Sequence, residues 1–369
     1  ASSMECRGEA YAALLTFHST SVTKWKTKIA AQGAKFDTQI NLLRTLLRSL
    51  RAVEHAECHR DFVLLLGVDV KLAEEHRSAL QRDGFKTLRI TPVQPGIPTT
   101  DKLHAWRLTN YTRVLFLDAD VMAIASLDDA FRQPEEFVIA AHPYDTVQGA
   151  ACGQPLERRG VTGMFALRPS ISTFDRLIAN LQLEPDLWDV TKTRHTPEQT
   201  GLSCFFRNVS RTWPCSYLFD IGNGGHTRGA KHFRGCQAFQ GVHQPGICEA
   251  IADHIAQECT WARSFADARA VHFKGSLKPW KAVPRCAEQI RKGRLMFYQG
   301  ANWVPLSPRD DLRWNQSSRT CTSVRHAAPV RWPDEAALPN RCCTFETLLK
   351  AEWHAFFLSA QSQTGLQVP

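Results

Sequence analysis

Short apolar runs alternate with stretches of helical periodicity along the chain. Apolar runs of about four to eight residues are typical of buried strands, and apolar residues three or four apart are typical of helices. The pattern predicts strands at 11–17, 62–67, 87–90, 114–117, 137–141, 160–169 and 270–273. It predicts helices at 38–50, 72–80, 101–108, 170–183 and 198–206. Because strands alternate with helices, we expect an α/β fold around a mainly parallel sheet.

The strand at 114–117 ends abruptly in two carboxylates, Asp118 and Asp120. Successive strand residues point to opposite faces, so two residues that are one apart leave the strand end on the same side. Converging carboxylates repel each other unless a cation lies between them, and a hard divalent cation that also holds a diphosphate suits this geometry. The alternative is an ordinary turn or helix cap after a strand, where Asp is common.

The chain has 369 residues, enough for one large α/β domain or two ordinary ones. No apolar run approaches the roughly 20 residues that cross a bilayer. No signal peptide opens the chain, and its first residues, Ala-Ser-Ser-Met, are compatible with a leader or membrane anchor that has been removed.

Twelve cysteines make an even count, and the absence of a Cys-x-x-Cys pair argues against structural zinc. Three glycosylation sequons begin at Asn110, Asn208 and Asn315. Even cysteines and sequons together favour an oxidising compartment. We therefore expect the lumen of the secretory pathway, Golgi or ER, rather than the cytosol.

The formal net charge of +9 favours anionic partners. Nucleic acid is disfavoured, because no groove-reading motif and no interleaving of aromatic with basic residues occurs. A nucleotide-sugar diphosphate, an anionic acceptor and acidic lipid headgroups are all compatible with the charge, although ordinary solvated surface accounts for most of the arginines.

Three motifs together resemble one protein family. They are Lys102-Leu-His-Ala-Trp106, Asp118-Ala-Asp120 and His272-Phe-Lys-Gly-Ser-Leu-Lys-Pro-Trp280. Over about residues 10–282 the chain resembles the glycogenin-like glycosyltransferases of family 8, which carry a Lys-Leu-x-x-Trp helix, an Asp-x-Asp strand end and a late His-x-x-Gly-x-x-Lys-Pro-Trp. Asp-x-Asp alone is a weak signal, and the two outer motifs make the resemblance specific.

The resemblance implies a GT-A (Rossmann-like) catalytic domain over 1–282, with helices flanking the central sheet. Its nucleotide-sugar-binding part would span about 10–125 and its acceptor part about 126–282. Residues 283–369 would form a cysteine-containing extension packed on the catalytic domain, with an amphipathic helix at 345–357. Packing on the catalytic domain is the favoured role of that helix, ahead of a membrane or partner surface.

The resemblance also assigns roles to individual residues. Asp118, Asp120 and His272 would bind Mn2+, which accepts mixed oxygen and nitrogen ligands. Glycine 275 would let backbone approach the diphosphate, and Lys278 would bring positive charge to the β-phosphate and take part in catalysis. The residues implied for the nucleotide-sugar are Leu15, Thr16, Phe17, Lys102, Asp118, Ala119, Asp120, Gly275 and Lys278.

The catalytic pair of the family is an Asp-Gln, and here Glu198-Gln199 stands in its place. Gln199 would stabilise the sugar cation and Glu198 would hold sugar hydroxyls, although a Glu at a helix start is also favoured by the helix dipole alone. A second departure is Val161-Thr162-Gly163, where the family has Asn-Ser/Ala-Gly. Either Thr162 replaces the Asn or the donor sugar is held differently.

The implied activity is Mn2+-dependent, retaining transfer of a hexose from a UDP-sugar to a glycan, protein or lipid acceptor, with UDP-glucose and UDP-galactose favoured over UDP-glucuronate or a pentose donor. The alternatives are a UDP-sugar hydrolase and a non-catalytic UDP-sugar-binding or scaffold protein. The sequence leaves open the acceptor, the disulfide pattern and the oligomeric state. It also leaves open whether Tyr217, in a segment resembling the family's self-glucosylating region, is modified.

Overall fold

The computed structural model describes residues 6, 8–16, 29–55, 57–141, 152, 160–189, 197–213, 217–221 and 269–273, together with five short strands between 296 and 330. The chain divides into two compact units, Ala1–His272 with Ala360–Pro369, and Phe273–Ser359.

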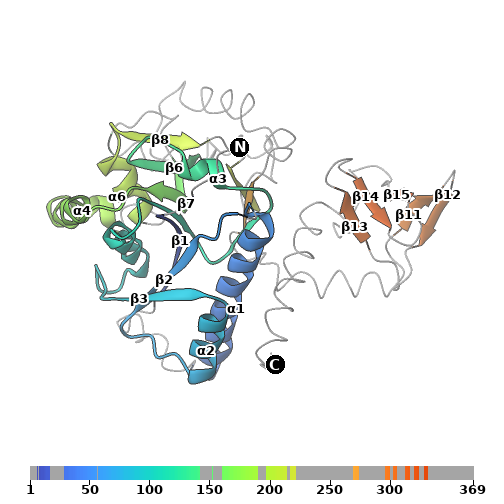
Figure 1. The fold of residues 1–369 in the computed structure, drawn as a ribbon, viewed down its shortest axis with the longest axis horizontal. Helices are drawn as coiled ribbons and strands as arrows, with labels where there is room; N and C mark the ends of the chain where they lie inside the picture. The colour runs from blue at the N-terminus through green and yellow to red at the C-terminus, as the bar shows by residue number, and fades with distance from the viewer. Residues whose placement is uncertain are drawn as a thin grey trace, which may run out of the picture. The chain divides into compact units, whose positions relative to one another are not determined.

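A seven-stranded mixed sheet forms the centre of the first unit (Figure 1). Its strands, in spatial order, are β3 (Phe85–Ile90), β2 (Asp61–Gly67), β1 (Glu9–Leu15), β4 (Arg113–Leu117), β7 (Gly160–Leu167), β6 (Phe137–Ala141) and β8 (Ser210–Trp213). The first four strands are parallel, β7 runs antiparallel to both β4 and β6, and β8 is parallel to β6. The expected α/β fold with a mainly parallel sheet is confirmed.

The helices cover both faces of this sheet. They are α1 (Ile29–Val53), α2 (Glu74–Arg82), the 3-10 helix η3 (Pro98–Arg107), α3 (Asp128–Phe131), α4 (Ile171–Leu183), the 3-10 helix η6 (Pro185–Trp188) and α6 (Pro197–Phe205). Figure 1 shows α1 and α2 on the side away from α4 and α6.

Two hydrophobic cores follow from the alternation of side chains along the strands. Tyr11 and Ala13 of β1 pack with leucines of α1, whereas Ala10 and Ala12 pack with residues of η3, α4 and α6. Successive residues of β1 therefore enter different cores, one on each face of the sheet. Strands buried on both faces read as continuous apolar runs, which is why the sequence pattern located them.

A second, three-stranded sheet has the order β5 (Val121–Ala123), β10 (Ala270–Phe273) and β9 (Leu218–Ile221). β5 follows β4 after only three residues, and its antiparallel partner β10 sets His272 opposite Val121. The sequence pattern located β4 and β10, but three-residue β5 is too short to give a periodic signal. The short helix expected at 101–108 is present as η3.

Five strands of the second unit are described. β11 (Met296–Gln299) pairs with β12 (Asn302–Pro305), and β13 (Leu312–Asn315), β14 (Thr320–Ser323) and β15 (Ala328–Val330) form a second antiparallel sheet. The helix expected at 345–357 lies outside the described residues. The domain boundaries drawn from the sequence remain a prediction.

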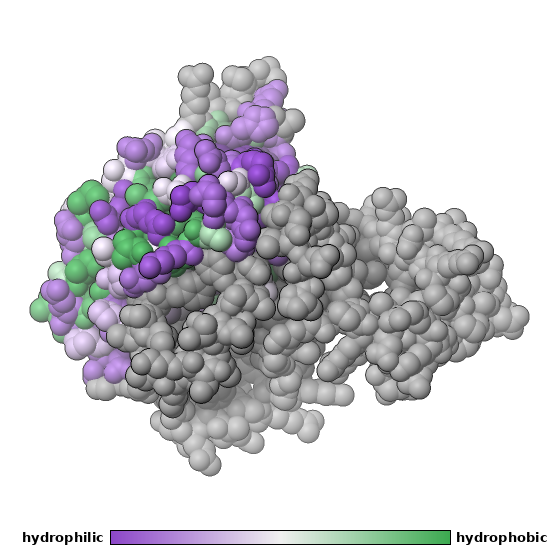
Figure 2. All heavy atoms as spheres, turned by 90° about the horizontal axis from the view of Figure 1, so that it is seen from below, coloured by the Kyte–Doolittle hydropathy of each residue, from purple (hydrophilic) through white to green (hydrophobic). Residues whose placement is uncertain are grey.

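Polar and apolar residues are mixed on the surface of the described part in Figure 2, where green patches lie among the purple. Among the described residues, the large hydrophobic residues that are exposed to solvent are Val68, Ile171, Leu183 and Val209. Within the described residues, no helix is both long enough and apolar enough to cross a membrane.

Helix α6 approaches η6 closely because Gly201 has no side chain. A Cβ built at Gly201 would lie 2.3 Å from Cε2 of Trp188, whose indole is fully buried. The indole Nε1 donates to Asn180 Oδ1 at 3.1 Å, which fixes the ring in place. This contact sets the position of the helix that carries Glu198 and Gln199.

We predict that Gly201→Ala lowers the free energy of unfolding by about 1–3 kcal/mol, because the added methyl group overpacks a fixed indole. Chemical denaturation of the purified chain measures the change. Combining Gly201→Ala with Trp188→Leu should cost less than the sum of the two single variants, since the smaller side chain relieves the clash. A double variant whose loss of stability equals the sum of the losses in the two single variants would contradict this account.

Candidate active site

Asp118 and Asp120 lie on a short turn that both ends hold in place. The Asp118 backbone N–H donates to Gly163 O of β7 at 2.9 Å, and the Asp118 carbonyl accepts from Val121 N–H of β5 at 3.0 Å. The chain therefore passes directly from the central sheet into the second sheet. Both side chains are half-buried, so their carboxylates are not simply solvated surface groups.

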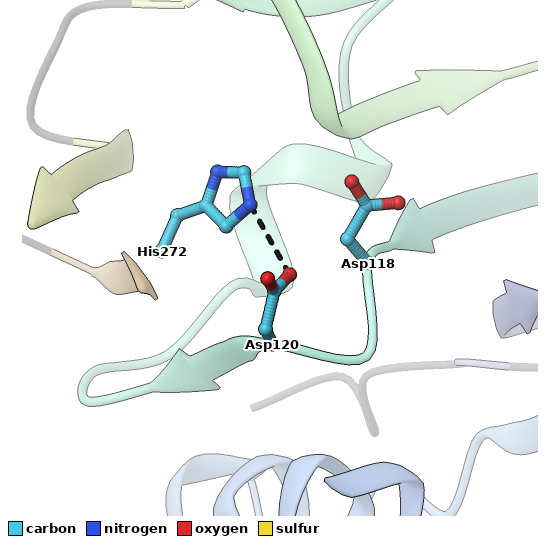
Figure 3. A group of neighbouring side chains, drawn as sticks. All are labelled: Asp118, Asp120 and His272. Carbon is cyan, nitrogen blue, oxygen red and sulfur yellow. Dashed lines mark ion pairs between the residues drawn. The ribbon is translucent and has the colours of Figure 1, made fainter. Parts of the chain in front are cut away.

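His272 reaches this turn from β10. Its Nε2 lies 3.2 Å from Asp120 Oδ1, and its side chain is nearly fully buried (Figure 3). One potential ligand atom from each of Asp118, Asp120 and His272 lies within 4.8 Å of the others. Figure 3 shows the imidazole turned toward Asp120, with Asp118 at the end of β4 facing the same space. Two carboxylates and an imidazole suit a divalent cation such as Mn2+.

Gly163 makes room for the His272 ring. A Cβ at Gly163 would lie 2.6 Å from Cε1 and 2.7 Å from Nδ1 of the imidazole. Sequence reasoning assigned no role to this residue. The sequence did contain a signal for this role, because a glycine inside a strand often marks the close approach of another group.

Lys102 of η3 is buried and occupies the centre of the site. Its Nζ lies 2.7 Å from Asp118 Oδ1 and 3.4 Å from Glu198 Oε1, and it donates a hydrogen bond to Thr162 O at 3.1 Å. Burial by itself lowers the pKa of Lys102, but the charges of Asp118 and Glu198 outweigh it and raise the pKa above its ordinary value. Lys102 is therefore a charged ammonium at neutral pH.

Glu198 and Gln199 lie in the first turn of α6 and are both buried. Thr162 Oγ1 donates to Glu198 Oε1 at 2.9 Å, so Glu198 is bound by both β7 and η3. The structure brings Lys102, Asp118 and Glu198 into one cluster although they are far apart in the sequence. Their chemical roles remain predictions.

Comparison with known proteins gives several relatives that share this part of the chain. Galactinol synthase 1 of Solanum lycopersicum is 26% identical over 179 residues, which are 42% of this chain and 54% of that protein. Human glycogenin-2 is 28% identical over 198 residues, or 53% of this chain and 30% of that protein. The chain is related to the family 8 glycosyltransferases.

The structure of the bifunctional glycosyltransferase WbbM superimposes with a TM-score of 0.50 and 12% identity, over 74% of this chain and 47% of that chain. This likeness is one of fold, and it agrees with the GT-A expectation. No family model matches the chain. The aligned part spans about half or less of the curated relatives above.

The departure from the family 8 pattern at 161–163 has a structural consequence. Val161 is buried in the hydrophobic core on the α1 side of the sheet. The polar contacts of this strand segment come from Thr162, through both its carbonyl and its hydroxyl. Which of the two alternatives that the sequence left open holds for the donor sugar stays a prediction.

The end of β1, expected to contact the nucleotide, is held by Asp101. Thr16 Oγ1 donates to Asp101 Oδ2 at 2.9 Å, and Asp101 Oδ1 accepts from Val93 N–H at 2.8 Å. The Leu15 side chain lies in the hydrophobic core, so only its backbone is available to a ligand. Sequence reasoning missed Asp101, which directly precedes Lys102. Ala119 packs against the same core as Leu15.

Three residues predicted for the site fall outside the described part of the chain. They are Phe17, Gly275 and Lys278. Their roles stay predictions drawn from the family resemblance.

Tyr217 is buried and its hydroxyl is engaged. It donates to Asp129 Oδ2 at 2.6 Å, and the Arg269 guanidinium lies 4.9 Å from the ring centroid. Burial and the hydrogen bond to Asp129 raise the pKa of Tyr217 to about 12. The Tyr217 hydroxyl is therefore engaged by Asp129 and not easily ionised.

Two disulfides are described, Cys6–Cys58 and Cys152–Cys204. Cys204 lies on α6, the helix that begins with Glu198 and Gln199. The expectation that the cysteines form disulfides is confirmed for these pairs, and the cellular compartment remains a prediction.

We predict that Gly163→Ala lowers Mn2+ affinity by roughly 10- to 100-fold, the usual range when a group that orients a metal ligand is disturbed. The reason is that the methyl group displaces the His272 ring. Titration of Mn2+ followed by electron paramagnetic resonance measures free metal directly. Adding Gly163→Ala to His272→Ala should have little further effect, and a full additional loss would show that the glycine acts elsewhere.

We predict that Lys102→Met destabilises the chain by about 3–5 kcal/mol, because it leaves two carboxylates without their shared buried cation. Urea denaturation gives the free energy of unfolding. The double variant Lys102→Met/Glu198→Gln should be more stable than Lys102→Met, since one uncompensated charge is then gone. If the double variant is no more stable than Lys102→Met, the ion pair contributes little to the free energy of unfolding.

Proposed function

We propose that the chain is a Mn2+-dependent retaining glycosyltransferase that moves a hexose from a UDP-sugar to a separate acceptor. UDP-glucose and UDP-galactose are the favoured donors. The observation that carries the proposal is the convergence of Asp118, Asp120 and His272 beside a buried ion pair of Lys102 with Glu198. The relationship to proteins named galactinol synthase and glycogenin supports it.

The residues that would hold Mn2+ are Asp118, Asp120 and His272. Bound there, the ion would supply positive charge for the leaving diphosphate. Lys102 fixes one oxygen of Asp118 at 2.7 Å and so limits how that carboxylate can turn. Under the proposal, Lys278 adds a further positive charge at the β-phosphate.

The sugar end of the site is formed by α6. Glycosyl transfer passes through a state with cationic character at the sugar, as glycoside hydrolysis does. Gln199 can place its amide oxygen near that charge, while Glu198 accepts hydrogen bonds from sugar hydroxyls. Retention of configuration requires the acceptor to enter on the leaving-group face or through a double displacement.

The acceptor is a separate glycan, protein or lipid. Tyr217, the tyrosine in the segment that resembles the self-glucosylating region, is a buried residue whose hydroxyl is bound to Asp129, which argues against its modification. We place the reaction in the secretory pathway, and the two disulfides support that placement.

The proposal is tested by UDP release from UDP-glucose, UDP-galactose, UDP-glucuronate and UDP-xylose, with Mn2+ or with EDTA. We expect release from one donor that depends on Mn2+ and falls to background in Asp120→Asn. Asp175→Asn, at an exposed position on α4, is the matched control and should keep full activity.

Other outcomes separate the alternatives. Mn2+-dependent UDP binding without release from any donor, in the presence of mixed glycan, protein and lipid acceptors, would support a scaffold protein. Release that water alone sustains at the full rate would indicate a hydrolase. Absence of Mn2+-dependent UDP binding would overturn the site assignment.

A further inference from the structure

Two of the glycosylation sequons lie in the described part of the chain, and neither belongs to the candidate active site. They are Asn110-Tyr-Thr112 and Asn208-Val-Ser210. In both, the middle residue is not proline, so each meets the requirement for an N-glycosylation acceptor. The third sequon begins at Asn315, whose side chain lies outside the described part of the chain.

Asn110 and Asn208 occupy the same position in a tight turn. In each turn, the backbone N–H of the residue after the asparagine donates to the carbonyl of the residue two positions before it, at 3.0 Å for Asn110 and 2.9 Å for Asn208. Both side chains are exposed. Asn is a common turn residue for its own hydrogen bonding, so the turn alone identifies no site. An exposed turn that also begins a sequon has the room that a bulky surface glycan needs.

The register of the central sheet places both asparagines at one edge. One row of paired residues crosses four strands of the sheet: Val114 of β4, Leu167 of β7, Phe137 of β6 and Ser210 of β8. Since β4 and β6 are both antiparallel to β7, and β8 is parallel to β6, the strands β4, β6 and β8 run in one direction. Asn110 and Asn208 both come shortly before this row in the sequence. They therefore lie at the same edge, where β4 and β8 begin.

The candidate active site lies at the opposite end of β4. Asp118 directly follows the last residue of this strand, whereas Asn110 precedes the first. At roughly 3.3 Å per residue, the five residues of β4 span roughly 16 Å. Glycans attached at Asn110 and Asn208 would therefore leave the edge that carries Asp118 accessible to a donor and an acceptor.

Two further features near Asn208 suit a glycan. The disulfide Cys152–Cys204 ends on α6 shortly before Asn208, and disulfides persist in the oxidising compartments through which glycoproteins pass. β8, which begins just after Asn208, is the last strand of the central sheet (Figure 1). Edge strands can pair with other chains, and a bulky group at the start of such a strand hinders that pairing.

We propose that Asn110 and Asn208 are N-glycosylated, so that the sheet edge remote from Asp118 carries carbohydrate. The proposal rests on the placement of the chain in the secretory pathway under the proposed function. The co-substrate is a lipid-linked oligosaccharide. The Asn amide nitrogen forms a bond to the anomeric carbon of its first sugar, the bond from that carbon to the lipid diphosphate breaks, and the diphosphate and the amide proton leave.

The order of glycosylation and folding differs between the two positions. The glycosylating enzyme has to contact the hydroxyl residue of the sequon. Thr112 is exposed in the folded chain, whereas Ser210 is buried and pairs with β6. Transfer to Asn208 therefore has to precede the docking of β8 onto β6.

The test is mass spectrometry of peptides from the protein isolated from its own cells. Treatment with peptide-N-glycosidase in heavy-oxygen water converts each glycosylated Asn into a labelled Asp. We expect label at both Asn110 and Asn208, and a digest without the glycosidase controls for spontaneous deamidation. Isolated protein without label at either position would overturn the proposal, and an unlabelled Asn at one position would overturn it for that position.

A second experiment identifies the cause of a negative result. The chain is secreted from cultured insect cells behind a cleavable leader. Asn110→Gln and Asn208→Gln should each remove one glycan, seen as a step in electrophoretic mobility. Thr112→Val should also remove the glycan on Asn110, whereas the matched variant Thr112→Ser should keep it, because serine preserves the sequon.

The two experiments separate the possible failures. If the secreted chain carries both glycans and the isolated protein carries neither, the placement in the secretory pathway is wrong and the proposal fails with it. If the secreted chain carries neither glycan, the two turns do not accept carbohydrate and the proposal fails on its own. Both experiments measure glycan occupancy and not turnover, so a loss or absence of UDP release would refute the proposed activity without changing this result.

Discussion

The candidate site depends on one buried ammonium group. Lys102 Nζ contacts Asp118 on the β4 end, Glu198 on α6 and the Thr162 carbonyl on β7. Without it, the buried carboxylate of Glu198 would have no cation to offset the desolvation of its charge, and the half-buried carboxylate of Asp118 would lose the same partner. The lysine thus fixes three elements of the fold relative to one another at the place where chemistry is expected.

Close backbone approach is the second constraint. Gly163 admits the His272 ring, and Gly201 admits the Trp188 indole against α6. Each glycine sits where two elements meet, one beside the proposed metal ligands and one beneath the proposed sugar site. The geometry of the site therefore depends on two glycines, whose lack of a side chain lets a ring pack closely, as much as on the polar groups themselves.

The sequence predicted the parts of this arrangement that local patterns encode. The apolar run before Asp118 and the alternation along a strand gave β4 and its paired carboxylates, and the resemblance to the family 8 glycosyltransferases added Lys102 and His272. The Thr162–Glu198 bond, the Asp101–Thr16 bond and the packing around Gly163 were not predictable, because each depends on which elements become neighbours in the folded chain. The pairing of Cys152 with Cys204 was equally hidden, since twelve cysteines allow very many connectivities.

The pairing of β5 with β10 has a consequence for the order in which the chain folds. Asp120 and His272 come together although about 150 residues separate them in sequence. Contacts between such distant residues form late, because loop-closure entropy opposes them until the rest of the chain is ordered. The central sheet can thus assemble during synthesis before His272, the third of the proposed metal ligands, emerges, and a bound divalent cation would then favour the docking of β10. Metal supply in the compartment where the chain folds would influence how much of it reaches the complete form.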